Sequence, residues 1–113
     1  MKLPYRKRAF VPLEKISHYL LSLTHEKGRH KAIFLRRLGF NETNTNLFKK
    51  ALLKIAHNND LESSRDIINN GVYLGKSYAI MGEVTGANGS ANIKTVWKIL
   101  ENRRKPSLVT VTW

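Results

Sequence analysis

The chain has 113 residues, the size of one ordinary domain, and 42% of them are hydrophobic, which is enough for a core without metals or disulfides. It has no cysteine, which excludes disulfide scaffolds, cysteine-based zinc sites and thiol nucleophiles. A formal charge of +12 indicates a polyanionic partner. Residues 1–54 hold 13 Lys and Arg against 3 acids, so we expect the first half to form the positive face.

No stretch approaches the roughly 20 apolar residues of a transmembrane helix. The basic start at residues 2–8 is followed by an apolar run that is too short for a signal peptide. We therefore expect no membrane segment and a cytoplasmic site of action. No repeat or flexible linker interrupts the chain, which predicts a single domain over 1–113, with a helical half (1–59) and a sheet half (60–113).

The first half shows the three-and-four spacing of apolar residues that is typical of helices. This spacing predicts a first helix over 12–23. A second, short helix is expected over 29–38, where Gly39 suits the C-terminal cap. A third helix is predicted over 46–58, because the preceding Asn and Thr residues offer several N-caps.

Beyond residue 60 the pattern changes to alternation, with β-branched and aromatic residues between turn signals. Asn88-Gly89 is the strongest of these turn signals. We therefore expect an α+β fold in which three N-terminal helices are followed by a four-stranded antiparallel sheet. The predicted strands are 62–68, 76–85, 91–100 and 108–113.

A first candidate site lies where a loop enters the second predicted helix. Arg29, His30 and Lys31 bring a guanidinium, an imidazole and an ammonium to a helix N-terminus, which is a natural phosphate site. The helix dipole and these cations favour a neutral imidazole, which can accept a proton. The alternative is an ordinary helix start, in which His30 caps the helix and the two cations are solvated.

A second candidate site is the segment from Lys94 to Trp97 in the third strand. Alternation places Thr95 and Trp97 on the more apolar face and Lys94 and Lys98 on the other. At the seam between helices and sheet, the Thr95 hydroxyl could orient a phosphate, and Trp97 could pack beneath the site or stack on a base. The alternative is a core tryptophan beside a threonine whose hydroxyl bonds to the backbone.

At these two clusters the chain resembles a small family of uncharacterised bacterial domains, found alone and as C-terminal modules of polymorphic toxins. More distantly, it is similar to the metal-independent ribonuclease superfamily of barnase, EndoU, colicin and RelE-type toxins (BECR), whose members set helices before a four-stranded antiparallel sheet. The family commonly has Arg where Lys94 stands, and a different tail from Val111-Thr112-Trp113. The motifs that carry the resemblance are Met1-Lys2-Leu3-Pro4, Gly28-Arg29-His30-Lys31-Ala32, Leu38-Gly39-Phe40, Ala51-Leu52-Leu53, Gly75-Lys76-Ser77-Tyr78, Gly86-Ala87-Asn88-Gly89, Thr95-Val96-Trp97 and Leu108-Val109-Thr110.

The resemblance implies an endoribonuclease toxin that needs no metal or other cofactor and cleaves RNA through attack by the 2′-hydroxyl, with transfer RNA among the candidate substrates. It also implies an acidic immunity or antitoxin protein as partner. His30 would act as base or acid, Lys31 would stabilise charge, and Thr95 would hold a phosphate oxygen. The substrate-binding residues would be Arg29, Lys94, Trp97 and Thr110.

Two other functions fit the same charge. One is a non-catalytic module that binds RNA or DNA, and the other is a regulatory protein whose basic surface docks an acidic partner. If the enzymatic function holds, we expect His30, Lys31 and Thr95 to share one solvent-accessible cleft. If the site lies instead on the helix-free face of the sheet, Lys94 and Lys98 are the relevant strand residues.

Overall fold

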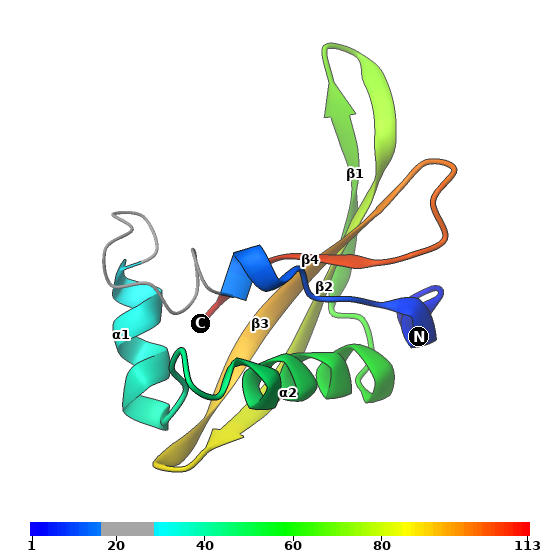
Figure 1. Cartoon of the computed structure of the whole chain (residues 1–113). Coiled ribbons are helices and arrows are strands. Elements are labelled where there is room, and N and C mark those ends of the chain that lie inside the picture. Colours follow the sequence, from blue (N-terminus) through cyan, green and yellow to red (C-terminus); the bar gives the residue numbers. More distant parts are fainter. Residues whose placement is uncertain (17–28) are drawn as a thin grey trace.

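The computed structural model describes residues 1–16 and 29–113. In these residues, two α-helices precede a four-stranded antiparallel sheet, so the chain is α+β (Figure 1). The N-terminal segment also contains one short 3₁₀ turn, η1. The elements are η1 (Arg6–Arg8), α1 (Arg29–Leu38), α2 (Thr45–Asn58), β1 (Ser63–Asn69), β2 (Val72–Gly86), β3 (Gly89–Leu100) and β4 (Ser107–Thr112).

The prediction of three N-terminal helices is wrong for the described residues, which contain only α1 and α2 before the sheet. Of the predicted first helix, residues 12–16 are described and residues 17–23 lie outside the described residues. Within 12–16, the amides of Lys15 and Ile16 both bond to the Pro12 carbonyl. Residues 13–16 are helical and the side chain of Ile16 is buried, but this short piece forms no separate α-helix among the described elements.

The C-terminus of α1 is capped as the sequence predicts. Gly39 adopts a left-handed conformation with φ of 106°, and its amide bonds to the Arg36 carbonyl while the next amide, that of Phe40, bonds to Leu35. This pair of bonds is a Schellman motif. It turns the chain so that Phe40 enters the core, where its ring centroid lies 4.9 Å from that of Phe48 on α2.

Helix α2 packs closely across the sheet because β2 has a glycine at the contact. A Cβ atom at Gly82 would lie 2.5 Å from Ile55 Cγ1, so only glycine allows this approach. The buried residues of α2 are Phe48, Leu52, Ile55 and Ala56. Leu47, in the first turn of the helix, is apolar but 49% exposed.

The two faces of the sheet differ in composition. The closed face meets α2 and the N-terminal segment, and its buried side chains form the core together with those of the helices. Residues directly opposite on neighbouring strands share a face, so the register identifies the members of each face. The closed face includes Ile80, Val84, Ile93, Thr95, Trp97, Leu108 and Val111.

No described helix packs on the opposite face, which we call the open face. It contains small, polar and basic side chains rather than large apolar ones. Its central members are Ser63, Arg65, Ser77, Ala79, Met81, Lys94, Val96, Lys98, Thr110 and Thr112.

The N-terminal segment runs across the closed side and ties the ends of the sheet together. Near its start, Lys2 forms a bridge with Asp60 ahead of β1, and Phe10 forms a parallel bridge with Ser107 at the start of β4. Leu3 lies between the two bridges and Val11 follows the second, and both side chains are buried. In the parts of the chain that the structure describes, no helix is long and apolar enough to cross a membrane.

Candidate functional site

The structure places Thr95 and Trp97 in the core, not in an accessible cleft. Both side chains are fully buried. The Trp97 indole Nε1 donates to Thr95 Oγ1 at 2.8 Å, and Thr95 Oγ1 donates to the Ile80 carbonyl at 2.9 Å. The expectation that Thr95 meets His30 and Lys31 in a solvent-accessible cleft is therefore wrong. The Thr95 hydroxyl is buried and already donates one hydrogen bond and accepts another, so it cannot contact a phosphate.

A substitution separates this structural role from a catalytic one. Thr95→Val would leave the indole N–H of Trp97 buried without an acceptor, so we expect the free energy of unfolding to fall by about 1 to 3 kcal/mol. Urea unfolding measures this change. Thr112→Val, which removes a hydroxyl from the open face, is the control and should change stability by less than about 0.5 kcal/mol. A Thr95→Val protein as stable as the wild type would contradict the structural role.

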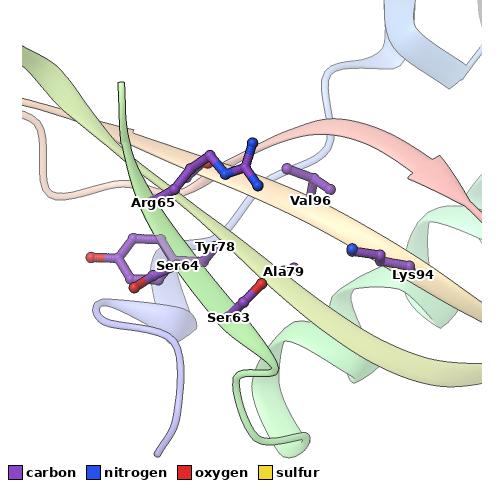
Figure 2. Close-up of a pocket in the computed structure, with 8 residues that line it drawn as sticks. Ser63, Ser64, Arg65, Tyr78, Ala79, Lys94 and Val96 are labelled. Atoms are coloured by element: carbon purple, nitrogen blue, oxygen red, sulfur yellow. The ribbon is translucent and has the colours of Figure 1, made fainter. Parts of the chain in front are cut away.

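The open face carries a pocket of about 240 Å³, which we call the Arg65 pocket. Its floor is formed by Ala79 and Val96. Ala79 is only 7% exposed although no described helix covers it. The larger side chains of the pocket lining surround its methyl group. Figure 2 shows the Arg65 guanidinium and the Lys94 ammonium extending toward the same space beside Val96. The lining residues are Ser63, Ser64, Arg65, Ser77, Tyr78, Ala79, Lys94 and Val96.

The chemistry of the Arg65 pocket suits an oxyanion. Guanidinium and ammonium groups donate charged hydrogen bonds to phosphate, and serine hydroxyls add neutral donors. Among the described residues, the carboxylate paired with these cations is that of Glu62, whose Oε1 lies 3.8 Å from Lys94 Nζ, with both side chains substantially exposed. An ion pair this long and exposed contributes little. It does not prevent Lys94 from binding an anion.

A second cationic group adjoins the pocket on β4. The strand has a bulge where Val96 pairs with Thr110 and Trp97 pairs with Leu108, which leaves Val109 without a partner on β3. Lys15 Nζ donates to the Val109 carbonyl at 2.9 Å. Lys31 Nζ donates to Thr110 Oγ1 at 2.7 Å. The bulge thus collects two ammonium groups, from the N-terminal segment and from α1, on consecutive residues.

Both lysines at the bulge are partly buried, and this changes their protonation. Burial lowers the pKa of Lys31, because the charged ammonium is less well solvated there. Burial also lowers the pKa of Lys15, and the positive charge of Lys98 lowers it further. Residues with perturbed pKa values near a cleft are candidates for functional residues.

One row of side chains joins the bulge to the Arg65 pocket. Ser63, Ala79, Val96 and Thr110 lie directly opposite one another across the four strands. Neighbouring strands are about 5 Å apart, so Thr110, which accepts the hydrogen bond from Lys31, lies roughly one strand spacing from the pocket floor at Val96. The two cationic groups therefore form one continuous basic surface.

The structure brings some of the predicted site residues together. Lys31 and Thr110, 79 positions apart, are in direct contact, and Lys94 lies on the same face. His30 is exposed in the first turn of α1, next to Lys31. Arg29 begins the same helix.

Three contributors to this surface were not predicted from the sequence: Arg65, Lys15 and the bulge. Alternation could have found Arg65, because it shares a face with Ser77 and Lys98 in the observed register. Lys15 and the bulge gave no comparable signal. The open face also contains Arg65, Lys94 and Lys98 from the second half of the chain, so its positive charge does not come only from the first half, which we expected to form the positive face.

The described residues contain no group of three His, Asp or Glu side chains placed to hold a metal ion.

The comparisons with known proteins identify the family. Residues 2–112 match the family described as Domain of unknown function (DUF6883), so the chain belongs to that family. No curated protein matches the chain.

Proposed function

We propose that this member of the DUF6883 family binds RNA on the open face of its sheet and cleaves it without a metal ion. The observation that carries the proposal is the Lys31 to Thr110 contact at 2.7 Å. It fixes the first turn of α1, with His30 in it, beside a basic surface whose cations and hydroxyls suit phosphates. The net charge of +12 supports a polyanionic substrate.

In the proposed reaction, the 2′-hydroxyl of the RNA attacks the adjacent phosphorus. His30 takes the proton from that hydroxyl as the general base. The P–O5′ bond breaks, the departing 5′-oxygen takes a proton from solvent water, and His30 returns its proton to solvent. The RNA keeps a 2′,3′-cyclic phosphate end. DNA lacks the attacking hydroxyl and is not cleaved.

The basic surface stabilises the negative charge that grows on the phosphate oxygens. Lys31 provides this stabilisation, and the hydrogen bond to Thr110 holds its ammonium in place. Arg65 and Lys94 bind the phosphate in the Arg65 pocket. Thr95 has no part in this mechanism, and Trp97 supports the sheet from the core.

The proposal extends to location and partner. RNA cleavage of this kind would act in the cytoplasm, where the substrate is found. An inhibitor of such an enzyme would be acidic, because carboxylates can occupy the same cations as phosphates. Such a protein would cover the open face.

Digestion of RNA in EDTA tests the proposed activity. We expect the purified protein to cleave a mixture of cellular RNAs with EDTA present, and sequencing to show ends that carry 2′,3′-cyclic phosphates. Single-stranded DNA of matching sequence should remain intact. Intact RNA in the presence of tight RNA binding would identify a non-catalytic binding module instead.

A further inference from the structure

A second pocket, of about 250 Å³, lies beyond the Arg65 pocket along the open face. We call it the Phe10 pocket. Among the described residues, its lining holds three cations and no carboxylate. Its aromatic member is the Phe10 ring, 37% exposed, with the Lys105 ammonium 4.9 Å above the ring centroid. The lining residues are Phe10, Lys98, Leu100, Arg103, Lys105 and Ser107.

The register connects the two pockets. Arg65 and Ser77 line the Arg65 pocket, Lys98 and Ser107 line the Phe10 pocket, and the four residues lie opposite one another in one row across the sheet. Three strand spacings separate the ends of this row, about 14 Å in all. A phosphate held by Arg65 and a group held over Phe10 are thus within the span of a short piece of one nucleic-acid strand.

The backbone holds Phe10 firmly in this position. Its amide donates to the Pro106 carbonyl at 2.9 Å, and its carbonyl accepts from the Leu108 amide at 3.1 Å. These two hydrogen bonds fix the backbone that carries the ring beside β4. Lys105 is in a cation–π contact with it, so the ring face is turned toward a cation and away from the core.

We infer that the Phe10 pocket is a subsite for an unpaired nucleobase of the RNA whose phosphate lies in the Arg65 pocket; this inference rests on the proposed function. The base stacks on the Phe10 ring and displaces Lys105 toward the adjacent phosphate, which Lys98 and Arg103 also attract. A base in a duplex cannot stack on a protein ring without leaving its partner. The substrate class is therefore single-stranded RNA or RNA loops.

The inference is tested with two fluorescein-labelled strands that bind without being cleaved. One is a short single-stranded 2′-O-methyl RNA, and the other is the same strand with abasic sugars, which keeps every phosphate but has no bases. We expect the wild-type protein to bind the base-containing strand on the order of 10-fold more tightly. Phe10→Leu, which keeps apolar bulk but lacks a ring, should remove most of that preference.

Two further variants separate stacking from charge. Lys105→Gln should weaken binding of both strands to a similar extent, because it removes a phosphate contact. Lys50→Gln, on the exposed surface of α2, should change neither affinity. Each variant is compared with the wild type at the same ionic strength, because phosphate binding depends on salt.

The outcomes distinguish this inference from the proposed function. Equal affinity of the wild type for both strands would overturn the subsite and leave RNA binding through phosphates intact. A base preference that Phe10→Leu does not reduce would also overturn it. Failure of the wild type to bind either strand would overturn both.

Discussion

Replacing His30 by alanine is expected to lower the rate of RNA cleavage by about 100-fold or more. The imidazole is the group beside Lys31 in the first turn of α1 to which we assign proton transfer, and His30 is exposed. RNA affinity should be nearly unchanged, because the residues to which we assign phosphate binding lie elsewhere, on the open face. Cleavage under single-turnover conditions and binding of 2′-O-methyl RNA measure the two quantities separately.

His57 provides the control for this experiment. It lies on α2, which packs on the closed face, so His57→Gln should leave the cleavage rate per folded molecule unchanged. A His30→Ala protein that cleaves at the wild-type rate would remove His30 from the mechanism. A decrease in affinity that matches the decrease in cleavage would make His30 a binding contact.

Replacing Lys31 by methionine is also expected to have a large effect, a decrease in kcat on the order of 100-fold. Methionine keeps much of the apolar stem of lysine but removes the charge to which we assign stabilisation of the transition state. Thr110→Val should have a smaller effect, because it removes only the oxygen that positions the ammonium. In the double variant, Thr110→Val should not lower kcat further than Lys31→Met does alone. Full additivity would contradict the positioning role.

The lowered pKa of Lys31 predicts a pH dependence. A lysine carries its charge below its pKa and loses it as the pH rises through that value. Because the pKa of Lys31 is lowered from 10.5, kcat should fall at a lower alkaline pH than titration of exposed lysines would produce. Lys31→Arg stays charged throughout this range, so its alkaline fall should move to higher pH. Lys50→Arg, on the exposed surface of α2, is the control, and the alkaline fall in kcat should be unchanged in this variant.

Local patterns in the sequence predicted most of the fold. Alternation located the strands, and the Gly39 cap ended α1 where expected, because both depend on neighbouring residues. The long β2 was predicted only from residue 76. Its first residues, Val72 to Leu74, pair beyond the core in the projecting hairpin, where exposed apolar residues follow no inward pattern (Figure 1).

The candidate site was less accessible to sequence reasoning because its parts meet only in three dimensions. Alternation correctly put Thr95 on the apolar face, but its burial depends on the Ile80 carbonyl and the Trp97 indole, which come from register and packing. The contact between Lys31 and Thr110 depends on the bulge at Val109, for which the sequence contains no signal.

The central claim is that RNA binds and is cleaved on the open face, and two charge-matched double variants test it most directly. Arg65→Gln with Lys94→Gln removes two positive charges from the Arg65 pocket, and Lys50→Gln with Lys54→Gln removes two from exposed positions on α2. Affinity for single-stranded RNA is measured over a range of salt concentrations, and cleavage is measured in EDTA.

We expect the Arg65 and Lys94 double variant to lower both RNA affinity and the cleavage rate strongly. The slope of log affinity against log salt should decrease by about 0.7 for each phosphate that this variant no longer neutralises. The α2 pair should leave the cleavage rate and that slope close to wild type. Equal effects of the two pairs, or a larger effect of the α2 pair, would contradict an RNA site on the open face.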